Sequence, residues 1–113
     1  MKADAHLRPA SSLERAIVLA RPDPTTSVAI IENAWGAAYH WISYGCVQKY
    51  QQHRDKHQGL IAYLVGLGEA LLAQWGRNFE DLRQAGFYGN QAGESEVQEA
   101  LDLLERIRTW ATA

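Results

Sequence analysis

Apolar residues recur at steps of three and four along most of the chain, which is the spacing of one face of an α-helix. The longest such run extends from Ser27 to about Gln52 and predicts one long helix with a single buried stripe. Two glycines, Gly36 and Gly45, lie inside it, and each costs about 1 kcal/mol in helix propensity relative to alanine. We therefore expect close approach of a neighbouring helix there. The stripe consists of Val28, Ile31, Trp35, Ala38, Ile42, Cys46 and Tyr50.

A shorter helix is predicted before the long one. Residues 1–10 are mixed and polar, and we expect a flexible, frayed or extended segment there. The sequence from Ser11 to Glu14 has the pattern of a capping box, in which the serine hydroxyl and the glutamate carboxylate satisfy backbone amides at a helix start. This helix should end near Ala20, because the Arg21-Pro22-Asp23-Pro24 segment disfavours helical backbone before each proline.

The second half of the chain predicts three more helices. One runs from about His57 or Gly59 to Trp75, with Gly76 as its stop, and a short one runs from Asn78 to near Gly86. The first of these has an apolar face wide enough to contact more than one neighbour. That face consists of Leu60, Leu64, Leu67, Leu71 and Trp75, with Ile61, Val65 and Leu72 beside it.

The last predicted helix has the clearest amphipathic pattern in the chain. The Ser95-Glu96-Val97-Gln98 segment reads as a capping box at its start. No window shows strand alternation bounded by hairpin turns. The chain is therefore predicted to be all-α, an antiparallel up-and-down helical bundle of four to five helices, with residues 11–113 as one domain. The apolar stripe of the last helix is Val97, Leu101, Leu104, Ile107 and Ala111.

Size and charge narrow the classes of function. A chain of 113 residues fits one domain, and its net charge of −2 with a pI near 6.0 argues against a protein that coats duplex DNA. The lone cysteine, Cys46, excludes an intrachain disulfide and favours a reducing compartment. No stretch offers about 18 consecutive apolar residues. We expect a cytoplasmic protein without a membrane partner.

Four segments come in the order seen in HEPN domains, which are small helical bundles often found beside minimal nucleotidyltransferases in toxin–antitoxin pairs. They are residues 34–40 in the long helix, residues 56–60 at the start of the next, residues 81–89, and the amphipathic closing helix. The chain resembles this family over residues 27–111. The resemblance implies a HEPN-like bundle that forms a homodimer, with a nucleotidyltransferase as partner protein and RNA or a nucleotide as ligand.

The sequence departs from the HEPN pattern at the motif of the family's ribonucleases. HEPN proteins that cleave RNA have an arginine followed by four to six residues and then a histidine. Arg83 matches the arginine, but Tyr88, Gly89 and Asn90 stand where the histidine would be. A family branch has an Arg-x-x-Ala-Asp-Tyr-like sequence here, and Gly86 and Phe87 replace its Ala-Asp pair. The chain is thus expected to be an interaction or nucleotide/RNA-binding component rather than an enzyme.

Arg83 has two interpretations. It either forms a structural ion pair with Glu80, Asp81 or Glu32, or it contacts an anion in a ligand site with Tyr88 and Phe87. In the second case Tyr88 supplies a hydroxyl group and Phe87 a surface on which a base stacks.

His40 is the second candidate catalytic residue. It is either a core histidine bonded to a polar neighbour or a proton-transfer group presented to Arg83, since histidine titrates near neutral pH. The alternative function is therefore a metal-independent ribonuclease that uses Arg83 and His40. His53 and His57 have an i, i+4 spacing but no third ligand in a recognisable motif, so we expect neither a metal site nor a cofactor. The four tryptophans favour a core or an interface.

Overall fold

In the part of the chain that it describes, the computed structural model contains five α-helices. The structure describes residues 4–20, 27–52, 58–88 and 93–113, and every regular element in these ranges is helical. The predicted all-α class and the number of helices are therefore confirmed. The helices are α1 (Asp4–Ala20), α2 (Ser27–Tyr50), α3 (Leu60–Gly66), α4 (Ala70–Tyr88) and α5 (Glu94–Thr112).

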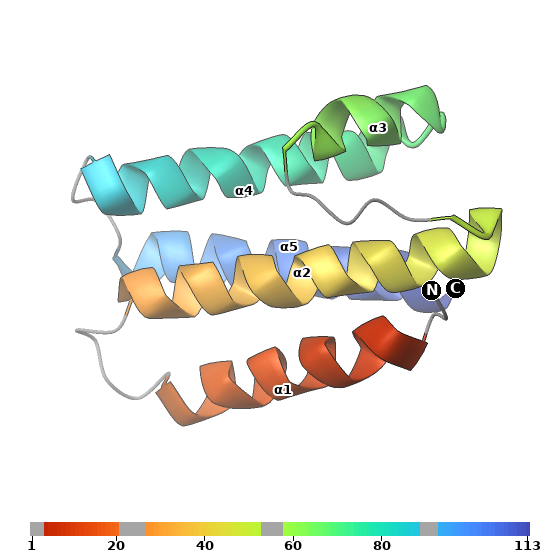
Figure 1. Cartoon of the computed structure of the whole chain (residues 1–113). Helices are drawn as coiled ribbons and strands as arrows, with labels where there is room; N and C mark the ends of the chain where they lie inside the picture. Colours follow the sequence, from red (N-terminus) through yellow and green to blue (C-terminus); the bar gives the residue numbers. More distant parts are fainter. Residues whose placement is uncertain (1–3, 21–26, 53–57, 89–92) are drawn as a thin grey trace.

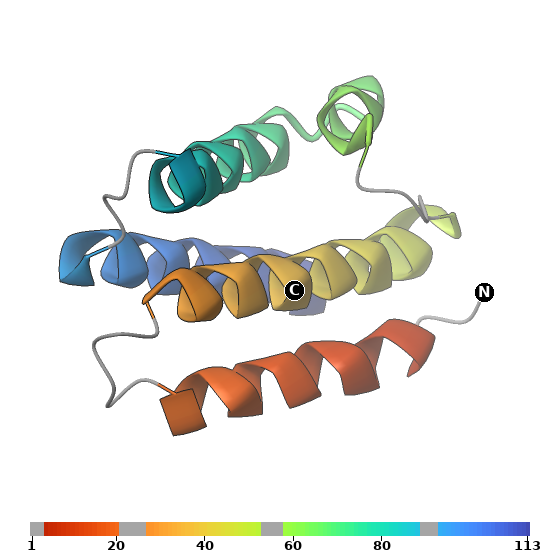
Figure 2. The same cartoon turned by 60° about the vertical axis from the view of Figure 1, so that its left-hand side comes forward.

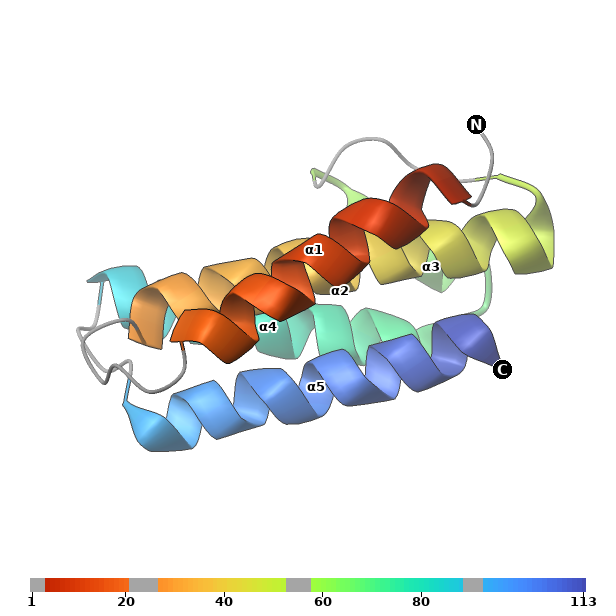
Figure 3. The same ribbon diagram turned by 90° about the horizontal axis from the view of Figure 1, so that it is seen from below.

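The four long helices run alternately in opposite directions, as Figure 1 shows. Helices α2 and α5 lie side by side in a middle layer, α1 covers one side of it, and α4 with the short α3 covers the other. Figure 2 shows the same three layers after a turn of the molecule. Seen from below, α1 lies across α2 while α5 runs alongside (Figure 3). The architecture is an antiparallel up-and-down bundle.

Helix α2 is the centre of the core, because it packs against α1, α4 and α5. Its burial is wider than the predicted single stripe, since Ile30, Ala34 and Trp41 are buried as well, while Tyr50 at its end is exposed. A Cβ atom at Gly45 would lie 2.9 Å from Cη2 of Trp110 on α5. One at Gly36 would lie 3.0 Å from a Leu13 methyl group on α1. The expected close approach at both glycines is confirmed.

Helix α1 starts at Asp4, seven residues before the predicted start at Ser11. Ser11 is an exposed residue inside the helix, so the prediction that it caps the helix is wrong. Pro9 also lies inside α1, where it removes one backbone hydrogen bond. His6 and Ala10, however, are 5% and 0% exposed. Burial of these residues against the bundle, which a local pattern does not show, extends the helix toward the N-terminus.

The boundary between α3 and α4 lies at Gly68 and not at the predicted Gly76. Gly68 has a φ of +82°, its N–H donates to Val65, and the N–H of Glu69 donates to Leu64. These two bonds form a Schellman motif, which ends a helix with a glycine in the left-handed region. The break changes the helical phase, so Leu71 is exposed rather than on the buried face.

Gly76 lies inside α4, where its small size serves a helix contact. A Cβ atom at this position would lie 2.5 Å from Cδ1 of Ile61 on α3. Helix α5 begins at Glu94, and the N–H of Gly93 donates to Glu96, so the predicted capping box at Ser95 is displaced by two residues. Among the helices described, none has both the length and the apolar character that crossing a bilayer requires.

Candidate functional site

Arg83 lies within helix α4 and not at a junction between helices. We expected the helix to end near Gly86, but its backbone continues to Tyr88. The i, i+3 spacing places Arg83 one turn after Glu80 on the same helix. The side chains of the two aromatic residues predicted to join the site, Phe87 and Tyr88, lie outside the described part of the structure.

The guanidinium group of Arg83 is held between two carboxylates and an aromatic ring. Its Nε donates to Glu32 on α2 at 2.8 Å, and its Nη1 donates to Glu80 at 3.0 Å. The Cζ atom lies 5.8 Å from the ring centroid of Trp35, which is also on α2. Through these contacts Arg83 connects α4 to α2. This is the structural ion pair that the sequence offered as one of two interpretations.

These contacts stabilise the charged form of Arg83. The hydrogen bond to Glu32 raises the pKa of Arg83 most, the charges of Glu32 and Glu80 raise it further, and burial works against them. Two carboxylates against one guanidinium leave a local net charge of −1. A phosphate group at this place would have to approach a negative cluster, which disfavours the predicted anion contact.

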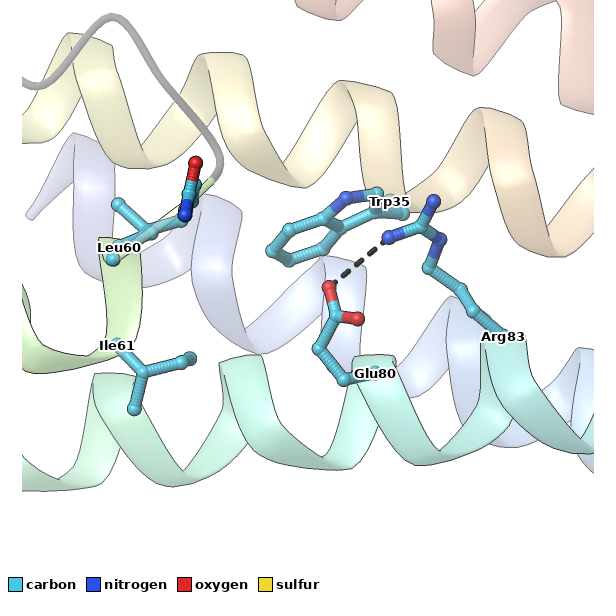
Figure 4. A pocket seen from close by; sticks show the side chains of 7 residues that line it. Trp35, Leu60, Ile61, Glu80 and Arg83 are labelled. Atoms are coloured by element: carbon cyan, nitrogen blue, oxygen red, sulfur yellow. Dashed lines mark hydrogen bonds and ion pairs between the residues drawn. The ribbon is translucent and has the colours of Figure 1, made fainter.

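A pocket of about 360 Å³ opens beside this ion pair, between α2, α4 and the start of α3. Figure 4 shows Glu80 and Arg83 on one side of it, Leu60 and Ile61 on the other, and Trp35 between them. Trp35 is 3% exposed and packs against Phe79, with ring centroids 5.4 Å apart. The pocket thus combines apolar walls with one charged rim. Gln58 and Gly59 complete its lining.

His40 makes a different interhelical contact. Its Nδ1 lies 3.0 Å from Nδ1 of His6 on α1, so one imidazole donates and the other accepts. The ring centroids are 5.3 Å apart, and Tyr39 meets the His40 ring edge-on. His6 is 5% exposed. His40 is therefore a histidine bonded to a polar neighbour at the α1–α2 interface.

The structure does not bring His40 and Arg83 together within the chain. Glu32, the α2 partner of Arg83, precedes His40 by eight residues, or about 12 Å along the helix axis. Arg83 belongs to α4 and His40 contacts α1, and these helices cover different sides of α2 (Figure 1). The two candidate groups of a rearranged nuclease site thus take part in separate helix contacts.

The remaining candidates have structural environments or lie outside the described ranges. His53 and His57 lie outside them. Among the described residues, no group of three or more His, Cys, Asp or Glu side chains is arranged to hold a metal ion. Cys46 is buried, and burial raises the pKa of its thiol to about 11, so at neutral pH it remains a protonated, apolar-like group.

The sequence predicted neither the pocket nor His6 as the partner of His40. The Glu80–Arg83 pair has an i, i+3 spacing that a sequence shows, but Trp35, Leu60 and Ile61 meet it only through the packing of three helices. His6 was placed in a segment expected to be flexible.

Comparisons with protein-family models, with curated proteins and with solved structures find no match for this chain.

Proposed function

We propose that this chain is a HEPN-like helical module that acts by binding, as an interaction or nucleotide/RNA-binding component, without ribonuclease activity. The main support for the proposal is that the guanidinium group of Arg83 is already paired with carboxylates. Both Glu32 and Glu80 accept hydrogen bonds from its guanidinium group. A catalytic arginine stabilises negative charge that develops in the transition state, and a guanidinium already paired with two carboxylates offers little to that charge.

The position of His40 supports the same conclusion. Cleavage of RNA through a 2′-hydroxyl gains from a group that transfers protons near neutral pH at the reacting atoms. In this chain His40 shares a hydrogen bond with the buried His6 at the α1–α2 interface. It is thus not directed to a phosphate held at Arg83.

The partners follow from the resemblance to HEPN domains. We propose a homodimer that acts in the cytoplasm with a nucleotidyltransferase, as part of a toxin–antitoxin or similar pair. Light scattering at micromolar concentration tests the homodimer, and a monomer would contradict it. Co-purification with the product of a neighbouring nucleotidyltransferase gene tests the second partner.

A ribonuclease assay tests the proposed function directly. The purified protein is incubated with a structured RNA in the presence of a chelator, and we expect the RNA to stay intact. Binding of the same RNA is measured in parallel by mobility shift, so that lack of cleavage is separated from lack of contact.

Variants identify the source of any cleavage that is observed. Arg83→Ala and His40→Ala are compared with Arg106→Ala, a change of an exposed arginine on α5. Metal-independent cleavage that both of the first variants abolish and the third retains would establish the alternative ribonuclease and refute the binding-only proposal. Cleavage that all three variants retain would indicate a contaminant.

A further inference from the structure

Two histidines connect the first turns of α1 to α2. Nδ1 of His6 lies 3.0 Å from Nδ1 of His40, and the two ring planes are tilted by 36°. Two nitrogen atoms at this distance form a hydrogen bond only when a single proton lies between them. One ring therefore donates from its Nδ1 and the other accepts. The contact excludes the state in which both Nδ1 atoms carry a proton.

The attachment of this end of α1 to the bundle depends mainly on His6. Among residues 5–10, His6 and Ala10 are the buried side chains, and they lie one turn apart on one face of the helix. Leu7 between them is 38% exposed. The methyl group of an alanine buries little apolar area, so it stabilises the docked helix only weakly. The histidine contact is thus the main link between residues 4–10 and α2.

The later turns of α1 have an attachment of their own. Glu14 accepts hydrogen bonds from Trp41 on α2 at 3.1 Å and from Arg108 on α5 at 3.3 Å. Pro9 lies between the two attachments and lacks the N–H that would bond to the preceding turn of the helix. The first turns can therefore separate from α2 while the turns that carry Glu14 stay in place.

Among the described side chains, the carboxylates of α1 and α2 are distant from the histidine pair. Glu14 follows His6 by eight residues, and Glu32 precedes His40 by eight, which is about 12 Å along each helix axis. Glu14 is bound to α5 and Glu32 to α4. Arg8 is exposed and adds positive charge to the first turns. A second imidazolium group at the pair would thus meet repulsion without a nearby carboxylate.

The other groups that could titrate or carry charge at this side of the bundle do not change that balance. Helices α3 and α4 cover the opposite side of α2 (Figure 1). The groups on α2 and α5 are Tyr39, whose ring meets His40, Tyr44 beside Trp41, the exposed Lys49, and Arg108 with its partner Glu105.

We propose that the His6–His40 contact is a pH-sensitive switch, in which protonation of both rings releases residues 4–10 of α1 from α2. The closed pair requires one Nδ1 without a proton, so it binds one proton fewer than two separated imidazolium groups. Histidine has a usual pKa of about 6.5, so the additional proton is gained as the pH falls below about 6. The closed state is therefore stable at neutral pH and is weakened about tenfold per pH unit in acid.

Opening uncovers His40 and the surface of α2 next to it. This surface lies away from Arg83, which contacts α2 at Glu32 and Trp35. The switch is therefore independent of the proposed binding function, and either can fail without the other.

Amide hydrogen exchange of the full chain, measured by NMR at pH 7, 6 and 5, tests the proposal. Protection factors correct for the intrinsic effect of pH on exchange. The amides of residues 8, 10 and 11 have helical acceptors in residues 4–7. We expect their protection to fall about tenfold or more between pH 7 and pH 5, because the open state gains a proton. The amides of residues 37–46 in α2 should stay protected.

The imidazole rings provide a readout that needs no variant. Their nitrogen chemical shifts report which ring atoms carry a proton. At pH 7 we expect one protonated and one unprotonated Nδ1 in the pair of His6 and His40. Two unprotonated Nδ1 atoms would contradict the proposal, since no hydrogen bond could then join them.

Matched variants identify the titrating group. His40→Asn places an amide near the position of Nδ1, and an amide can donate to a neutral His6 or accept from a protonated one. The pH dependence of protection at residues 8, 10 and 11 should therefore disappear. Glu14→Gln removes the carboxylate at the other attachment of α1 and should retain the pH dependence. Thermal melting at pH 7 shows that both variants are folded.

Three results would overturn the proposal. One is equal protection of these amides at pH 7 and pH 5. Another is an unchanged pH dependence in His40→Asn, because a different group would then titrate. The third is a simultaneous loss of protection in α1 and α2, which would indicate acid unfolding of the whole bundle instead of release of one segment.

Discussion

At the scale of single residues, Arg83 shows how one side chain combines a local and a distant contact. Glu80 is its neighbour one turn earlier on α4, and such pairs follow from helical spacing. Glu32 is 51 positions away and comes into reach only because α4 packs against α2. The sequence named both as partners in an ion pair and left a ligand contact open as the alternative. The structure shows the ion pair, because the packing of α4 on α2 places two carboxylates around one guanidinium group.

Arg83→Ala should lower the free energy of unfolding by about 1–2 kcal/mol, because Glu32 and Glu80 lose their shared partner and Trp35 loses its covering group. Arg83→Lys should lose less, since an ammonium group keeps the charge but lacks the planar fork that reaches both carboxylates. Urea unfolding followed by circular dichroism measures both. Arg106→Ala on α5 is the control, and an equal loss there would contradict the role given to Arg83.

At the scale of elements, helix ends depended on backbone conformation more than on composition. Several glycines occur between residues 59 and 76, and the sequence alone selected Gly76 as the stop. Gly68 is the residue with positive φ, and it closes α3 through the bonds from residues 68 and 69 back to 65 and 64. Gly76 keeps helical backbone and makes room for Ile61 instead. Both roles require glycine, but only the packing of α3 on α4 distinguishes them.

Gly68→Ala and Gly66→Ala form a matched test of this assignment. A Cβ atom meets nothing within 4 Å at either position, so the φ of +82° at Gly68 is the difference between them. We expect Gly68→Ala to lower the free energy of unfolding by about 1 kcal/mol, because alanine is strained in the left-handed region. Gly66→Ala should leave it unchanged or raise it slightly through helix propensity. Chemical denaturation measures both, and equal effects would contradict the Schellman motif.

At the scale of the whole molecule, carboxylates bridge three helices at two places. Glu14 on α1 accepts hydrogen bonds from Trp41 on α2 and Arg108 on α5. Glu69, just before α4, accepts from Tyr50 at the end of α2 and from Trp110 on α5. These contacts connect the helices that surround α2. No local sequence pattern predicts them, because the partners lie on different helices. Of the tryptophans expected in a core or an interface, Trp35 and Trp41 are buried in the core, and Trp75 and Trp110 are half-buried against it.

Gly45→Ala tests the packing of α2 against α5. A methyl group there would press on the Trp110 ring, and overpacking of this kind costs about 1–3 kcal/mol, more than the gain of about 1 kcal/mol in helix propensity. We therefore expect a lower free energy of unfolding. In the double variant Gly45→Ala/Trp110→Leu the two losses should not add, because the smaller side chain leaves room for the methyl group. A stabilising Gly45→Ala would show that the ring does not sit there.

The sequence by itself determined the helical class, the long central helix, the amphipathic last helix and the position of Arg83 one turn after Glu80. These features follow from periodicity, propensity and the spacing of residues within one helix, all of which are local. Only the tertiary structure decided where α1 begins, which glycine ends α3, which partners Arg83 and His40 take, and that a pocket forms beside Trp35. Each of these depends on residues far apart in the chain that are brought together when the apolar faces of three or more helices are buried.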